Sequence, residues 1–383
     1  GLGDVYKRQT ILYDIFGTPF GWIMRLIYQL VNNYGVAIVL FTIITKILLF
    51  PISYKQQKNT LRMQLIQPKL KKLQAKYKDK PQELQQAQMQ LYQEEHVNPM
   101  SSCLPMFLQF FLLFGVLDVV YKPLTHILHY SKSVISKVVE ISTGILGDSV
   151  AKQYTGLRQE LGVLKAFQDN PSAFSNVDTF DTSKVSDFME HFTVFGVNLG
   201  ETPTWHPEVW NASAVILFCI PLLSGILQLI MTIYMQIMQK KRGTAPEQNM
   251  GCMNVMLYVM PLFSVWFAFQ VSAGVGFYWA CSSFFSLVQT IGLNLYFTPE
   301  RGAKIIEKEN KKMEARYAAG KQSFTERVMN QNAGAARVQE TEKTKNMSNR
   351  ELSSYNKQKI QEARKRMAEK YGETYEEDSS DED

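Results

Sequence analysis

The sequence predicts an all-α membrane protein, a five-span helical bundle with a cytoplasmic antiparallel helical hairpin and an external insert. A membrane-spanning helix needs about 20 mostly apolar residues. Five stretches of the 383-residue chain meet or nearly meet this need, at residues 34–52, 103–121, 212–238, 255–271 and 275–297. The segments between them are strongly polar, and basic residues gather in alternate connections. A soluble helical protein is the alternative, and five such apolar stretches argue against it.

The chain opens with residues 1–18, which we expect to lie outside the membrane. We set residues 1–9 (GLGDVYKRQ) aside as a non-native extension. Residues 19–32 carry apolar side chains at helical spacing, which predicts an amphipathic helix lying in the outer membrane interface. Thr18 is the expected N-cap, and Pro19 the expected first helical residue. The apolar positions are Phe20, Ile23, Ile27, Leu30 and Val31.

Basic residues predict the orientation of the spans, because they are enriched in cytoplasmic loops. The connection after the first span (33–52) is residues 53–100, which contain nine Lys and Arg against four Asp and Glu. The loop 240–253 opens with Lys-Lys-Arg, and the tail 298–383 begins with further basic residues. Residues 122–211 lean acidic and belong outside. These assignments put the N-terminus outside and the C-terminus in the cytoplasm.

The cytoplasmic segment 53–100 predicts a helical hairpin. Two apolar stripes at helical spacing flank a break at Lys78–Pro81, since proline suits the start of a helix and not its interior. Two amphipathic helices joined by a short turn pack antiparallel. Pro68 should bend the first arm. The stripes are Leu61, Leu65, Ile66, Leu70, Leu73 and Tyr77, and then Leu84, Ala87 and Leu91.

The other spans are predicted at 101–121, 212–239, 254–272 and 275–297. Residues 122–211 form a partly helical external insert, and the tail 298–383 is charged and largely disordered. Basic stretches of the tail have two interpretations: a solubilising segment, or a contact with anionic lipid or ribosomal RNA. His126 and His129 stand three residues apart, but no third ligand is placed, so we expect no metal site.

Lys46 lies inside the first span, six residues before Ile52, with no acidic residue nearby. A charge at the centre of a span costs about 2.5–3.5 kcal/mol. Either the side chain reaches back toward the headgroups, or it faces a water-filled cavity. Uncharged polar residues on several spans favour the cavity: Thr42, Gln109, Gln228, Thr232, Ser286, Gln289 and Thr290. Asp118 is the only acidic residue in the spans, which argues against a proton- or cation-coupled transporter.

The sequence contains no HExxH, GxSxG, GxxxxGK[ST] or GxGxxG motif. We therefore expect neither an enzyme nor a cofactor. A cavity with one positive charge and several neutral hydrogen-bonding groups is suited to solvating polar or acidic peptide segments as they cross the membrane.

Three segments carry a resemblance to a known family: YGVAIVLFTIITKILLFPISYKQQK, LYQEEHVNPMSSCLPMFLQF and VGFYWACSSFFSLVQT. They resemble the bacterial YidC-type membrane protein insertases of the Oxa/Alb superfamily, in the short form without a large external domain. The resemblance covers roughly Pro19–Phe297 apart from the insert. It implies a hydrophilic groove open to the cytoplasm and to lipid, with a positive residue at Lys46 and an aromatic residue at Trp279. Arginine is commoner at the first position, and lysine keeps the charge without the two-pronged geometry.

The expected function is therefore insertion and folding of nascent membrane proteins in the bacterial plasma membrane, by a multi-pass protein acting alone or with the Sec translocon. The resemblance implies the ribosome, the signal recognition particle receptor and membrane lipids as further partners. Two alternatives stay open: a small-solute transporter or channel, which would need an inverted repeat, and a chaperone that binds clients without inserting them. The expected groove residues are Lys46, Thr42, Gln109, Gln228, Thr232, Trp279 and Gln289.

Overall fold

The computed structural model describes residues 2–78, 80–95, 97, 104–242 and 251–318. The chain divides into two units, residues 1–306 and 307–383. Most of the predicted tail lies outside the described residues. The described part of the second unit is the end of a helix, in which Lys311 Nζ donates to Glu307 Oε1 at 2.8 Å.

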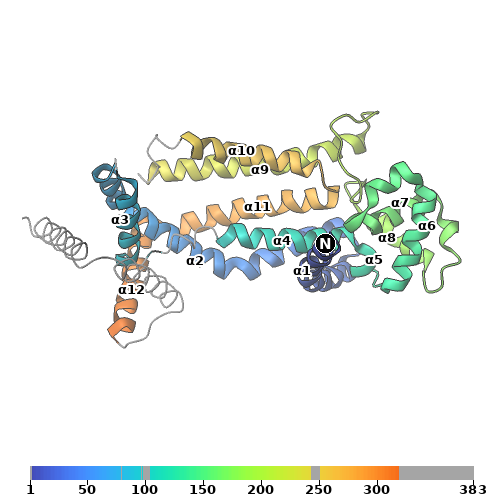
Figure 1. Cartoon of the computed structure of the whole chain (residues 1–383), viewed down its shortest axis with the longest axis horizontal. Coiled ribbons are helices and arrows are strands. Elements are labelled where there is room, and N and C mark those ends of the chain that lie inside the picture. Colours follow the sequence, from blue (N-terminus) through green and yellow to red (C-terminus); the bar gives the residue numbers. More distant parts are fainter. Residues whose placement is uncertain (1, 79, 96, 98–103, 243–250, 319–383) are drawn as a thin grey trace, which may run out of the picture. The chain divides into compact units, whose positions relative to one another are not determined.

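The described residues are mainly helical, which confirms the predicted all-α class (Figure 1). The elements are α1 (Leu2–Val31), α2 (Tyr34–Lys76), α3 (Pro81–Glu94), α4 (Leu104–Tyr121), α5 (Pro123–His126), α6 (Lys132–Ala151), α7 (Gln159–Asp169), α8 (Thr182–His191), β1 (Thr193–Val194), β2 (Val197–Asn198), α9 (Ala212–Lys241), α10 (Gly251–Ala268), α11 (Ala273–Tyr296) and α12 (Pro299–Ala318). Three short 3-10 turns lie between α6 and α8.

Helix α1 begins earlier than the sequence suggests. It starts at Leu2 and continues through Pro19, so the prediction that Thr18 caps a helix starting at Pro19 is wrong. Proline favours the first turn of a helix but does not enforce a start, and an interior proline bends a helix that continues on both sides. Most of the predicted apolar positions face the core: Ile27 is buried, and Phe20, Ile23 and Val31 pack against it, while Leu30 is 86% exposed. Met24 and Tyr28 are buried as well.

Helix α2 continues from the first predicted span into the polar region, through Pro51 and Pro68. It ends at Lys76, and α3 begins at Pro81, so the break falls where the sequence places it. Helix α3 packs against the C-terminal part of α2. The contact is a small apolar cluster of Ile66, Leu70, Leu91 and Val97, flanked by an ion pair between Lys69 and Glu95.

The apolar helices pack against one another and against α1. Helix α1 lies along α4, α2 lies against α11, and α9 contacts both α10 and α11. By length and composition, α2 and α9 are the two described helices that suffice to cross a membrane. Phe111–Tyr121 in α4 and Tyr258–Ala268 in α10 are shorter apolar stretches. The count of five spans stays a prediction.

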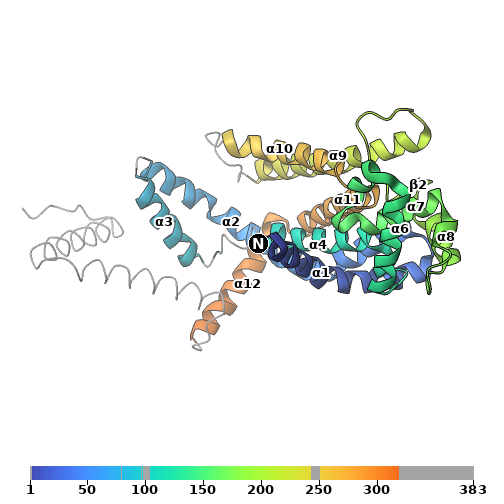
Figure 2. The same ribbon diagram turned by 45° about the vertical axis from the view of Figure 1, so that its right-hand side comes forward.

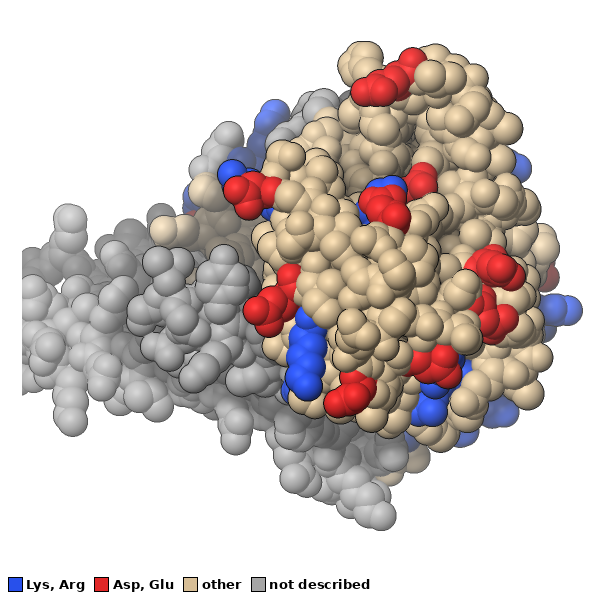
Figure 3. Space-filling model, turned by 90° about the vertical axis from the view of Figure 1, so that its right-hand side faces the viewer, with Lys and Arg blue, Asp and Glu red and all other residues tan. Residues whose placement is uncertain are grey.

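The segment between α4 and α9, the insert, contains α5–α8 and a two-stranded antiparallel sheet, β1–β2. Figures 1 and 2 show α6, α7 and α8 gathered at one end of the apolar helices. Its surface carries acidic and basic side chains scattered among uncharged ones (Figure 3). Two of its backbone carbonyls cap α11: Glu201 O accepts from Ala273 N at 2.6 Å, and Leu199 O from Gly274 N at 2.8 Å.

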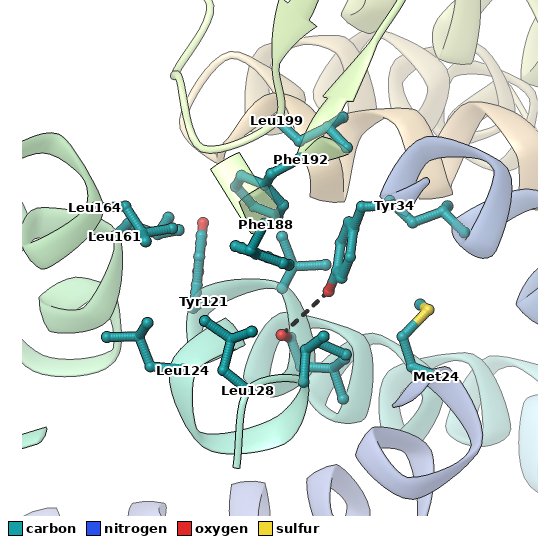
Figure 4. Packing of buried hydrophobic residues seen from close by; sticks show 14 of the residues in the cluster. Met24, Tyr34, Tyr121, Leu124, Leu128, Leu161, Leu164, Phe188, Phe192 and Leu199 are labelled. Atoms are coloured by element: carbon teal, nitrogen blue, oxygen red, sulfur yellow. Dashed lines mark hydrogen bonds between the residues drawn. The ribbon is translucent and has the colours of Figure 1, made fainter. Parts of the chain in front are cut away.

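The main core joins the insert to the apolar helices. Tyr34, at the start of α2, is fully buried, and its hydroxyl donates to Val119 O of α4 at 3.3 Å (Figure 4). The Tyr34 ring contacts Phe192 and Phe188 of the insert, with ring centroids 4.8 and 6.0 Å away. This packing holds the N-terminal end of α2, the helix that carries Lys46.

Candidate functional site

Lys46 contacts α11 across the interface between α2 and α11. Asn33 caps the N-terminus of α2, where its side chain accepts a hydrogen bond from Val36 N at 2.9 Å. Lys46 lies twelve residues after Tyr34, the first residue of α2, which is about 18 Å along the helix axis. Its ammonium donates to Ser286 Oγ at 2.7 Å. The side chain therefore reaches across to a neighbouring helix and is held inside the apolar part of the fold.

A second polar contact joins the same two helices further along. Gln57 Nε2 donates to Asn294 Oδ1 at 3.0 Å, and Asn294 is itself buried. Between the two contacts lies Gln289, whose Nε2 is buried without a hydrogen-bond partner among the described residues. Because buried polar groups are normally paired, this amide is a place where water or a bound chain would make a hydrogen bond.

The structure distributes the other predicted groove residues unevenly. Thr42 is fully buried, and its hydroxyl donates to Ile38 O in its own helix. Thr232 likewise bonds Gln228 O at 2.9 Å within α9. Trp279 packs edge-to-face against Phe267 of α10, with ring centroids 5.4 Å apart. Gln109 of α4 is half-buried, and no described contact brings it to Lys46.

The hydrogen-bond partner of Lys46 is an uncharged side chain. Among the residues that the structure describes, no carboxylate forms an ion pair with it, and its hydrogen bond goes to a neutral hydroxyl. An ammonium without a counter-charge in an apolar setting is costly. The site is therefore suited to a negatively charged or strongly polar group that arrives and leaves.

The acidic residue of the predicted spans is engaged elsewhere. Asp118 is buried in α4, where it forms an ion pair with Lys122 and lies 2.6 Å from His126 Nε2. His126 is thus committed to a carboxylate, and the described residues include no group of three potential metal ligands. Helix α1 touches this pair through glycines: a Cβ at Gly17 would lie 2.0 Å from Asp118 Oδ2 and one at Gly21 2.2 Å from His126 Nδ1.

Sequence reasoning missed this buried charge cluster. Asp118 lies in α4, Lys122 between α4 and α5, and His126 in α5, and their helical spacing of four residues each time is the signal in the sequence. Sequence reasoning also missed a second buried carboxylate, which lies in the insert. Glu160 is buried and accepts from Thr125 N at 3.0 Å, and burial raises the pKa of its carboxyl.

Comparison with known proteins agrees with the resemblance. The profile of the family described as "60Kd inner membrane protein" matches residues 26–302, well over half of the chain. Proteins named "Membrane protein insertase YidC" are similar: 42% identical over 103 residues in Granulibacter bethesdensis, 41% over 111 in Caulobacter vibrioides (strain NA1000 / CB15N) and 44% over 98 in Francisella tularensis subsp. novicida. These matches cover 27%, 28% and 26% of this chain and in each case 18% of the relative's length.

Proposed function

Because this chain belongs to the family of 60Kd inner membrane proteins, we propose that it inserts nascent membrane proteins into the bilayer and helps them fold. The similarity to proteins named "Membrane protein insertase YidC" supports that activity. The proposal includes five spans in the bacterial plasma membrane, with the N-terminus outside and the C-terminus in the cytoplasm. The α2–α3 pair is then the cytoplasmic hairpin, and the insert lies outside.

The observation that carries the proposal is the Lys46–Ser286 contact, in which a cation inside an apolar helix pair donates to a neutral hydroxyl. In the proposed mechanism, the polar end of a client enters a wetted groove between α2 and α11 and is attracted by Lys46 when it is acidic. Groove water lowers the cost of taking peptide groups out of bulk water. The apolar segment of the client then leaves sideways into lipid, where burial of its surface at about 25 cal/mol per Å² favours release.

The exposed residues around the helices support a lateral path. Large apolar side chains on α9 and α10 face outward, among them Ile226, Ile230, Leu262, Phe263 and Trp266. Such faces are expected in lipid, and a client helix can lie against them. No nucleotide takes part in this scheme. The proposed partners are the ribosome and the signal recognition particle receptor, which deliver clients, and the Sec translocon, with which the protein works.

The charge is tested with purified protein in vesicles and a client whose translocated segment is acidic. A hydrogen bond to a charged group contributes about 1.5–3 kcal/mol, so Lys46→Ala should slow insertion roughly tenfold or more. Lys46→Glu should slow it further, and Lys46→Arg should retain most of the rate. Lys55→Ala removes the same charge from an exposed position of the same helix and should leave the rate unchanged. If Lys46→Ala and Lys46→Glu both insert the client at the wild-type rate, the proposed role of the Lys46 charge is refuted.

The wetted groove is tested separately by thiol labelling. After the four native cysteines are replaced by alanine, Lys46→Cys should react with a membrane-impermeant maleimide in oriented vesicles. Ile47→Cys is the matched control, since Ile47 is the next residue along and is 66% exposed on the apolar face. Equally slow labelling at both positions would show that water does not reach position 46, and the groove would be refuted while the family membership stood.

A further inference from the structure

A small cavity lies where α2, α9 and α12 meet, away from Lys46. Its volume is about 130 Å³, several times the roughly 30 Å³ that one water occupies in the liquid. Residues from all three helices line it: Leu61, Gln64 and Leu65 of α2, Arg242 at the end of α9, and Gly302 and Ala303 of α12. All of them belong to the first unit of the chain.

Arg242 is under-satisfied in this cavity. Its Nη1 donates to Gln64 Oε1 and its Nη2 to Phe297 O, both at 3.3 Å, and both acceptors are neutral. Its Nε is buried and has no partner among the described residues. Burial lowers the pKa of the Arg242 guanidinium. A buried cationic donor left unpaired normally marks a missing ligand or water.

The cavity lies at the level where apolar helices become polar. Helix α9 passes from Ile237 and Met238 into its basic end, and α11 ends at Tyr296. Aromatic rings gather there: Phe297 is 5.0 Å from Tyr54 and 5.1 Å from Tyr296 between ring centroids. Tyrosine is enriched at the membrane–water interface. Leu295 and Tyr296 are 70% and 50% exposed, which leaves room for an acyl chain beside the cavity.

We propose that this cavity binds the phosphate of an anionic phospholipid, with Arg242 as the recognising residue. The guanidinium offers Nε and Nη donors in the fork that phosphate oxygens accept. A tetrahedral phosphate fits the cavity volume. The acyl chains of the phospholipid then continue along the exposed end of α11. Exposed cations next in sequence to the lining residues, Lys240, Lys241, Arg301 and Lys304, add a favourable field. This site is independent of the groove and of any client.

The full-length protein in neutral detergent is titrated with dihexanoyl phosphatidylglycerol, dihexanoyl phosphatidylcholine or inorganic phosphate, and the Kd is obtained from the shift in Tm. Phosphatidylglycerol should raise the Tm most. Arg242→Gln should weaken its binding at least tenfold, which corresponds to about 1.4 kcal/mol. Lys241→Gln removes the same charge from the exposed neighbouring position and should change the Kd less than twofold.

Three results would overturn the proposal. Equal weakening by Arg242→Gln and Lys241→Gln would indicate a diffuse surface field. An equal effect of inorganic phosphate would assign the cavity to a free anion. No shift with any ligand would make Arg242 a structural clamp. If Arg242→Gln fails to fold, Arg242→Lys keeps the charge without the fork, and its binding should still weaken at least threefold; unchanged binding would refute recognition by the guanidinium.

Discussion

Replacing Gly17 by alanine should destabilise the protein by an unusual amount for a single methyl group. Gly17 lies in α1 directly over the buried carboxylate of Asp118. A Cβ there would lie 2.0 Å from Oδ2 and 2.6 Å from Cγ of Asp118. Non-bonded heavy atoms pack at about 3.5–4.0 Å, so the shortfall is about 1.5 Å and something must move.

The carboxylate cannot yield cheaply. Asp118 lies 2.6 Å from His126 Nε2 and is ion-paired with Lys122, so rotating it away breaks contacts of charged groups. Each such hydrogen bond contributes about 1.5–3 kcal/mol. Moving α1 instead loses its packing on α4, and overpacking of this kind costs about 1–3 kcal/mol. We therefore expect Gly17→Ala to lower the free energy of unfolding by about 2–4 kcal/mol.

The assay is denaturant unfolding in mixed micelles, monitored by circular dichroism. Gly292→Ala in α11 is the matched control, since a Cβ there meets nothing within 4 Å. Helix propensity should make it neutral to about 1 kcal/mol more stable. In an Asp118→Ala background the cost of Gly17→Ala should fall by at least about 1 kcal/mol, because the two positions are in contact. A cost below about 0.5 kcal/mol in the wild-type background, or full additivity, would refute the reasoning.

Three further predictions concern the core and the insert. Tyr34→Phe should lower the free energy of unfolding by about 1 kcal/mol, because Val119 O loses its buried donor; no change would mean that the bond is not formed in solution. Phe174→Ala should cost about 3–5 kcal/mol, since the ring is fully buried; a cost below 1 kcal/mol would contradict the packing. Burial raises the folded-state pKa of Glu160, so its stabilising contribution is complete below the unfolded pKa of about 4.3 and is lost as pH rises through the folded value. Glu160→Gln should flatten this fall in stability with pH, which pH-dependent unfolding measures; an unchanged slope would assign it to another group.

The sequence identifies the functional cation but not its partner. Lys46 is evident because a charge stands out in an apolar stretch. Ser286, Gln289 and Thr290 are all polar residues of the last predicted span, and which of them faces Lys46 depends on the rotation and depth of α11 relative to α2. Those quantities follow from packing along the whole interface, and periodicity within one helix contains no information on them.

Proline predicts a helix end correctly where the local sequence determines that end, and it fails where packing against another helix determines it. The break before Pro81 is predictable, because proline begins helices well. The same rule applied to Pro19 gives the wrong start, since α1 continues along α4 on both sides of that residue. Asp118 and His126 each stand out in the sequence, but their pairing with each other under α1 follows from packing and is not predicted.

The two carbonyls that cap α11 limit how the protein can be re-engineered. Glu201 O and Leu199 O accept from the first amides of the last apolar helix, and such amides have no acceptor within their own helix. A shorter loop grafted between α4 and α9 would leave Ala273 N and Gly274 N without hydrogen-bond acceptors, unless the loop placed carbonyl oxygens at the same positions. Chimeras that exchange the outer segment should therefore keep residues 193–201 with the recipient's α11, and their junctions belong before that strand pair.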